Sequence, residues 1–158
     1  MSKSSPNPNS SPSMFQTDFP SSEFSARRQD VFDRIGSNAV AVLQGASPRG
    51  ELELFRQSNE FYYLCGIEVP YAYLLLDARR RKTILYLPKR NIDQERSEGP
   101  VLNADDTDLA EKLTGVDEVR RTEEFSADIA DAETVYVPQG SEKHHNPLDL
   151  LNTHPTRE

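Results

Sequence analysis

The residues best suited to chemistry are a single cysteine, two adjacent histidines and two pairs of neighbouring carboxylates. Cys65 is the only cysteine among the 158 residues, so no intrachain disulfide can form. A nucleophilic thiol needs a neighbour that lowers its pKa, and the sequence around Cys65 holds aromatic and aliphatic residues but no histidine. We therefore expect Cys65 to be a small buried thiol.

The histidines do not form a convincing metal site. His144 and His145 follow Glu142 closely, and His154 lies further along in a polar stretch. Adjacent side chains point to different faces of a helix or strand, and one nearby carboxylate does not complete a site. We expect these residues at the surface; a small independent enzyme built on His144, His145 and Glu142 is the disfavoured alternative.

Two carboxylate pairs, Asp105-Asp106 and Glu123-Glu124, lie where helical patterns begin. Neighbouring side chains diverge on a helix, and negative charge near its start complements the helix dipole. A general acid–base pair would instead need carboxyl groups that converge on one point. We interpret both pairs as helix-start charges, and the sequence assigns no catalytic, cofactor-binding or metal-binding residue.

The most distinctive stretch runs from Phe55 to Pro70 and combines four aromatic residues with a polar cluster. Aromatic and arginine side chains supply large contact areas at modest entropic cost, which suits a protein interface or the wall of a substrate channel. The alternative is a scaffold role, in which Phe61 and a tyrosine lie in the core and Arg56 binds backbone carbonyls. The candidate interface or substrate-entrance residues are Arg56, Gln57, Asn59, Tyr62 and Tyr63.

Charge and hydropathy exclude several classes of function. The chain has 26 acidic and 18 basic residues, which disfavours nucleic-acid binding because phosphate contacts need a basic surface. No apolar run reaches the ~20 residues that span a bilayer, and no apolar segment follows Lys3 as it would in a secretion signal. We expect a soluble cytoplasmic protein that binds neither nucleic acid nor membrane.

Charge is also uneven along the chain. Residues 78–98 carry seven basic and three acidic side chains, whereas residues 101–133 carry three basic and eleven acidic ones. These two stretches could pair between chains, or both could form the solvated surface of one small domain.

The sequence indicates one domain, residues 21–140, between two tails. Residues 1–20 are rich in Ser, Asn and Pro, which predicts disorder, and residues 141–158 are mostly polar. The domain's alternating patterns predict an α/β fold with a mixed sheet flanked by helices. Helices are expected at 21–35, 58–65, 107–114 and 122–131, with a helical turn near 92–96. Strands are expected at 39–43, 71–76, 83–87, 116–119 and 134–137, the second and third forming a hairpin.

This order of features resembles the N-terminal domain of aminopeptidase P and related Xaa-Pro peptidases, a creatinase/prolidase N-terminal-domain fold. The shared hallmark is the run Arg56-Gln57-Ser58-Asn59, followed by Phe61, Tyr63 and Gly66. Further agreement comes, in order, from residues 24–28, 39–43, 84–90 and 115–118, so the likeness covers about residues 22–138.

The resemblance implies a non-catalytic domain that contributes to oligomerisation and to the substrate entrance. The parent enzyme would remove an N-terminal residue that precedes proline. In that family a separate C-terminal domain holds two metal ions, usually manganese, through two Asp, one His and two Glu. No residue here corresponds to that set, so the chain should hold no cofactor and be inactive alone.

The implied partners are the chain's own catalytic domain, for which residues 141–158 would begin a linker, and further copies of the chain. Peptide substrates would be met only through the parent enzyme. The alternative is a free-standing protein- or peptide-binding module with the same fold and no enzymatic activity.

Overall fold

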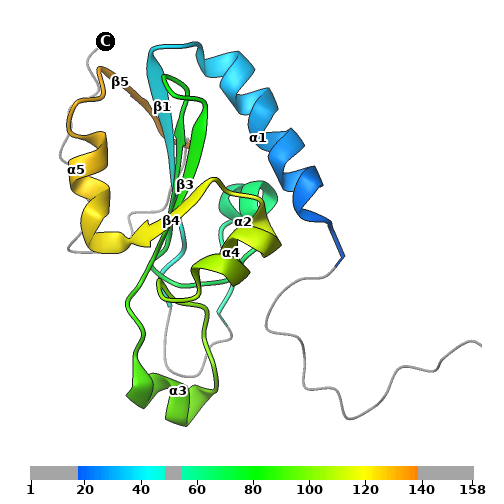
Figure 1. Ribbon diagram of the computed structural model, residues 1–158, viewed down its shortest axis with the longest axis vertical. Coiled ribbons are helices and arrows are strands. Elements are labelled where there is room, and N and C mark those ends of the chain that lie inside the picture. Colours follow the sequence, from blue (N-terminus) through cyan, green and yellow to red (C-terminus); the bar gives the residue numbers. More distant parts are fainter. Residues whose placement is uncertain (1–17, 49–54, 139–158) are drawn as a thin grey trace, which may run out of the picture.

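The computed structural model describes residues 18–48 and 55–138 (Figure 1). Its sheet has the strand order β4-β3-β2-β1-β5. The central strands β1, β2 and β3 pair antiparallel, whereas the edge strands β5 and β4 pair in parallel with β1 and β3. The expected mixed sheet is therefore confirmed. In chain order the strands are β1 Ala39–Gln44, β2 Tyr73–Asp77, β3 Lys82–Leu87, β4 Glu118–Arg121 and β5 Thr134–Tyr136.

Helices cover the two faces of the sheet unequally (Figure 1). Helices α1 (Ser21–Ile35), α2 (Asn59–Cys65) and α4 (Thr107–Thr114) lie on one face. The short α5 (Phe125–Ile129), entered through a 3-10 turn at Thr122–Glu124, lies on the other. Helix α3 (Ile92–Glu98) projects from one end of the molecule, away from both layers.

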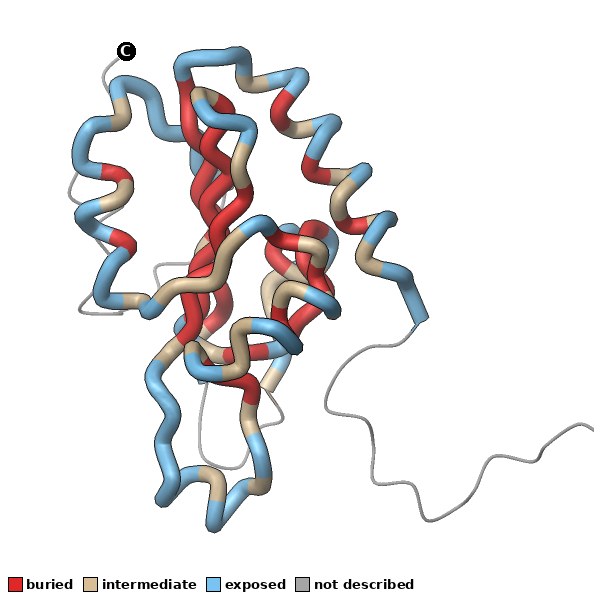
Figure 2. Tube along the Cα trace, viewed as in Figure 1, coloured by how far each residue is buried: buried red, intermediate tan, exposed pale blue. Residues whose placement is uncertain are grey.

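Two apolar clusters hold these layers together, one on each face. Strand residues alternate between them, so Leu74 and Leu76 pack towards α1, α2 and α4, whereas Tyr73 and Leu75 pack towards α5. The central strands are accordingly buried along nearly their whole length (Figure 2). Burial on both faces explains why β1 has a continuous apolar sequence.

Helix ends follow the signals that the sequence predicts. Gly66 and Gly115 end α2 and α4 in the left-handed conformation, with φ of 71° and 68°. Ser58 and Asp106 occupy the N-cap positions of α2 and α4, but neither side chain bonds to its own helix. Ser58 Oγ donates to the Gln44 carbonyl, and Asp106 accepts from the Asn103 amide.

Three other boundaries differ from expectation. Strand β2 begins at Tyr73 rather than Tyr71. Strand β4 begins at Glu118 rather than Val116, because the Asp117 carboxylate accepts the Thr83 amide at 2.7 Å just before ladder pairing starts. The helix expected over 122–131 divides into the 3-10 turn and the shorter α5. The predicted tails lie outside the described residues, apart from residues 18–20.

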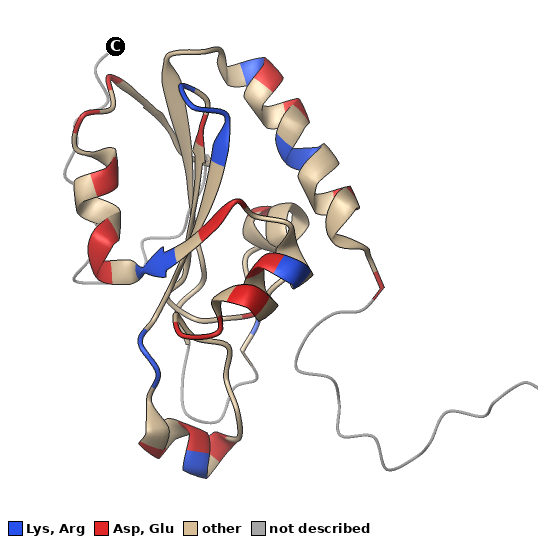
Figure 3. Cartoon of the chain, viewed as in Figure 1, with Lys and Arg blue, Asp and Glu red and all other residues tan. Residues whose placement is uncertain are grey.

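The basic and acidic stretches pair within one chain. Figure 3 shows where the two kinds of charged residue fall along the backbone. Lys82 lies 2.5 Å from Glu118, Lys89 lies 3.4 Å from Glu123, and Arg79 lies 3.2 Å from Asp131. Both sequence stretches thus form the charged surface of a single domain. None of the helices in the described ranges is long and apolar enough to cross a membrane.

Candidate interaction surface

Gln57 builds the support for α2. Its Oε1 accepts hydrogen bonds from the amides of Ala46 and Ser58, at 2.7 and 3.0 Å. Its Nε2 donates to the carbonyls of Val69 and Ile67, at 3.1 and 3.4 Å. The half-buried side-chain amide of Gln57 therefore joins the segment after β1, the start of α2 and the segment that follows α2. This residue supports the backbone and is not an exposed contact.

Arg28 anchors the other end of α2. It belongs to the buried stripe of α1, with only 2% of its surface exposed. Its Nη1 donates to the carbonyls of Leu64 and Thr114, and its Nη2 donates to Ser25 Oγ. Carbonyls in the last turn of a helix lack intrahelical donors, so this guanidinium satisfies the ends of α2 and α4 together. Burial lowers the pKa of Arg28.

The sequence contains only a weak signal for this anchor. Arg28 lies four residues after Phe24 and four before Phe32, so a charged residue occupies an apolar helical stripe. Its two carbonyl acceptors lie 36 and 86 residues away in the sequence, where no local pattern could identify them.

The exposed face of α2 carries an aromatic and cationic cluster. Tyr63 is 56% exposed, and the Arg27 guanidinium lies 4.4 Å from its ring centroid. Arg27 Nη1 also donates to the Tyr63 carbonyl at 3.0 Å, and Glu23 pairs with the same guanidinium. The ring of Phe19 lies 5.0 Å from this cation. Sequence reasoning missed Phe19 and Arg27 as surface candidates, although the Glu23–Arg27 spacing predicts a helical pair.

Three further candidates lie on α2 or just before it. Arg56 and Asn59 are exposed at the start of α2, whereas Tyr62 is half-buried. Burial is the main cause that raises the pKa of Tyr62, and the nearby charges of Glu68 and Asp18 act in the same direction. Asn59, Tyr62 and Tyr63 thus belong to α2, and Arg56 is exposed in the segment before it. Gln57, in contrast, is tied to backbone groups.

An apolar groove of about 520 Å³ adjoins this face, between α1, α2, β1 and β5. Tyr136 and Val137, which are 49% and 50% exposed, lie on its β5 side. An exposed apolar surface of this kind commonly marks a contact site. Its lining includes Val31, Ile35, Leu43, Tyr63, Tyr136 and Val137.

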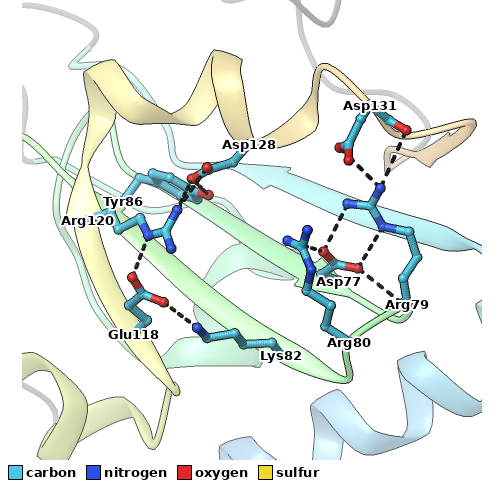
Figure 4. A network of polar contacts seen from close by, with 9 residues as sticks. All are labelled: Asp77, Arg79, Arg80, Lys82, Tyr86, Glu118, Arg120, Asp128 and Asp131. Carbon is cyan, nitrogen blue, oxygen red and sulfur yellow. Dashed lines mark hydrogen bonds and ion pairs between the residues drawn. The ribbon is translucent and has the colours of Figure 1, made fainter.

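The opposite face of the sheet carries a network of charged residues (Figure 4). Tyr86 donates to Asp128 at 2.6 Å, and the Arg120 guanidinium binds both oxygens of that carboxylate at 2.8 Å. Arg120 and Lys82 also bind Glu118, and these two hydrogen bonds lower the pKa of Glu118 to about 2. Every charge in this network has a partner, so it fastens α5 and β4 to the sheet.

Cys65 and the paired carboxylates take part in contacts that support the fold. Cys65 is buried, its Sγ donates to the Phe61 carbonyl, and burial raises its pKa to about 12. The expected buried thiol is confirmed. Asp106 accepts the Asn103 amide, Glu124 accepts the Arg121 amide, and Glu123 pairs with Lys89.

No three His, Cys, Asp or Glu side chains within residues 18–48 and 55–138 form a group that could hold a metal ion. Glu142, His144, His145 and His154 lie outside the described residues. A two-metal centre therefore does not fit this part of the chain.

Comparisons with known proteins agree with this architecture. The sequence is 40% identical over 77 residues to Xaa-Pro aminopeptidase 3 of Homo sapiens, which covers 45% of this chain and 15% of that protein. It is 31% identical over 119 residues to a probable Xaa-Pro aminopeptidase of Fusarium vanettenii, covering 71% of this chain and 25% of that protein. The chain thus spans a quarter or less of the length of these relatives.

Solved structures show the same fold. Aminopeptidase P from E. coli with the inhibitor Pro-Leu superposes with a TM-score of 0.67 and 23% identity, covering 80% of this chain and 31% of that chain. A zinc-substituted E. coli aminopeptidase P in complex with product gives the same TM-score. The family model described as "Aminopeptidase P, N-terminal domain" matches residues 24–136. The chain therefore belongs to the family of aminopeptidase P N-terminal domains.

Proposed function

We propose that this domain serves an Xaa-Pro aminopeptidase-like metallopeptidase without taking part in its chemistry, by mediating self-association and lining the substrate entrance. The parent enzyme would remove an N-terminal residue that precedes proline, with two manganese ions bound outside this domain. A reducing compartment such as the cytoplasm suits the chain, whose one cysteine is a buried free thiol.

The observation that carries this proposal is the outer face of α2. Asn59 and Tyr63 are exposed there, Arg56 is exposed just before the helix, and Arg27 stacks on Tyr63. Tyrosine and arginine are the side chains most enriched among residues that dominate binding energy at interfaces.

The support beneath this face makes it suitable for binding. Gln57 fixes the entry to α2 through four hydrogen bonds, and Arg28 fixes its exit. A surface held in place before contact loses less conformational entropy on binding than a mobile one.

A non-catalytic role agrees with the chemistry of the described residues. The Cys65 thiol is protonated and shielded, and the carboxylates that sequence patterns singled out bind backbone amides or a lysine. These hydrogen bonds and this ion pair account for the carboxylates without a role as nucleophile or general base.

Two measurements on the purified chain test the proposal. Light scattering coupled to size-exclusion chromatography should give a dimer or larger assembly. A hydrolysis assay on Xaa-Pro peptides with added manganese should give no turnover. Activity that depends on metal and survives repurification would contradict the non-catalytic role. A strictly monomeric chain would contradict self-association and would agree equally with a scaffold role and with the free-standing binding module.

A further inference from the structure

Strand β4 forms one edge of the sheet. It pairs with β3 on one side, and no strand in the described part of the chain pairs with its other side. Figure 1 looks onto this edge, and no described segment crosses in front of β4. An open edge presents backbone N–H and C=O groups that can pair with a further strand.

The backbone groups at this open edge belong to Glu118 and Arg120. The Asp117 amide donates to a carbonyl of β3, that of Thr83, at 3.0 Å. The hydrogen-bonding groups of successive residues in a strand point to opposite sides, so those of Val119 also point towards β3. Those of Glu118 and Arg120 therefore point away from β3, towards the open side.

Charge selects one way in which two copies of this edge can pair. In an antiparallel ladder, residues whose backbone groups point towards each other lie directly opposite. A two-fold axis at Glu118 or at Arg120 places two like charges opposite each other, which destabilises a pair. An axis at Val119 places Glu118 of each copy opposite Arg120 of the other, so both the backbone groups and the charges match.

We propose that two copies of the chain pair antiparallel through β4, about a two-fold axis at Val119, which joins their sheets into one. Glu118 and the partner's Arg120 exchange both of their N–H···O bonds. Within each chain, Lys82 of β3 and Arg120 already bind the Glu118 carboxylate. The partner's Arg120 flanks the same carboxylate from the open side, so the charge network continues from one copy into the other.

This contact goes beyond the proposed function and does not depend on it. It uses Glu118, Val119 and Arg120 of β4, whereas the proposed function assigns self-association to Arg56 and Tyr63 at the outside of α2. If the outside of α2 carries no contact, pairing through β4 remains measurable. If β4 carries none, variants of α2 still change the association.

Disulfide trapping tests the register of the pair. The two Val119 residues form a non-hydrogen-bonded pair with Cα atoms about 4.5 Å apart, which is within disulfide range. The Arg121 residues lie about 14 Å apart in the same pair, which is too far. Val119→Cys should therefore form a disulfide-linked dimer under mild oxidation at least ~10-fold faster than the matched control Arg121→Cys. The native Cys65 is buried and does not compete.

Both cysteine variants are made in the full chain that also carries Arg56→Asp and Tyr63→Asp. Only the β4 contact is then measured, because the proposed α2 contact is absent. Arg121 is exposed and Val119 is half-buried, so random collisions favour the control. Equal rates, or a faster reaction of Arg121→Cys, would overturn the inference.

Hydrogen exchange tests the same contact without a change in β4. The amides of Glu118 and Arg120 should exchange with solvent more slowly as protein concentration rises, because pairing covers them. The amides of α3, which projects away from the sheet, should exchange at constant rates. Rapid exchange of both β4 amides at every concentration would overturn the proposal. Slow exchange that does not depend on concentration would also overturn it, since the edge would then be covered within one chain.

Discussion

Arg28 of α1 donates a hydrogen bond to the carbonyl oxygen of Leu64, in the last turn of α2, at 2.8 Å. The same nitrogen reaches the Thr114 carbonyl at the end of α4, at 2.9 Å. One buried cation thus ties together the three helices that cover this face of the sheet. The exposed aromatic face of α2 depends on this internal joint for its position.

Replacing Arg28 should destabilise the whole domain. Arg28→Ala leaves two helix-end carbonyls buried without a donor and empties the space of a large side chain. We expect the free energy of unfolding to fall by about 3 kcal/mol. Urea denaturation followed by circular dichroism measures this loss. Arg34→Ala, an exposed change on the same helix, serves as the control and should cost less than ~0.5 kcal/mol. Equal midpoints for the two variants would contradict the anchoring role.

Gly66 should tolerate no side chain while Phe24 is present. Its φ is +71°, and a Cβ atom there would lie 2.3 Å from Phe24 Cζ. Gly66→Ala should therefore cost about 3 kcal/mol, from backbone strain together with overpacking. In a Phe24→Leu background the collision is relieved, so the same glycine substitution should cost at least ~1 kcal/mol less. Strictly additive losses in this double-mutant cycle would show that the two residues do not collide.

Glu118 should make stability depend on pH. Its hydrogen bonds to Arg120 and Lys82 lower the folded-state pKa to about 2, from an ordinary value of 4.5. A carboxyl with a depressed folded pKa stabilises the domain above its unfolded pKa, and this stabilisation is lost as pH falls from 4.5 towards 2. Because the pair lies near solvent, we expect a contribution of only about 1 kcal/mol.

The variant Glu118→Gln isolates this contribution. Its unfolding free energy should lie below that of the wild type at pH 7, and the two should converge in acid. Asp30→Asn, an exposed carboxylate on α1, controls for the general effect of removing one negative charge. A difference in unfolding free energy between the wild type and Glu118→Gln that stays constant down to the lowest pH measured would show that the ion pairs do not set the pKa of Glu118.

Cys65 should be unreactive until the domain unfolds. Burial raises its pKa to about 12, so almost no thiolate exists at pH 8, and the sulfur is shielded from solvent. A colorimetric disulfide reagent should label it only in denaturant. The thiol introduced by Ser97→Cys, on the exposed surface of α3, should react at once under native conditions and provides the comparison. Rapid native labelling of Cys65 itself would mean that this part of the core opens readily.

Local sequence patterns predict most of the framework of this domain. Helix α1, the β2–β3 hairpin and the ends of α2 and α4 follow from apolar periodicity and glycine position. These signals are local: Gly66 and Gly115 each close a helix within a few residues. Cys65 could also be placed in the core from its apolar neighbours.

The supports and the groove depend on contacts between distant segments. Gln57 has the same polar character as Arg56 and Asn59 in the sequence, yet its four hydrogen bonds go to backbone from three separate stretches. Val31 and Val137 each match an ordinary amphipathic or strand pattern, and only the parallel pairing of β5 with β1 brings them to one groove. Local propensity carries no information on such juxtapositions.

We propose that the outside of α2 is a contact surface, and sedimentation velocity on variants of that surface is the measurement that decides it. Arg56→Asp combined with Tyr63→Asp removes the arginine and the exposed ring and adds negative charge. Arg96→Asp, on the exposed surface of α3, adds charge elsewhere. We predict that the wild type and Arg96→Asp associate equally, whereas the double variant dissociates at least ~10-fold more readily, as expected when binding hot spots are lost. Equal association of all three proteins, or a wild type that remains monomeric throughout, would contradict the claim.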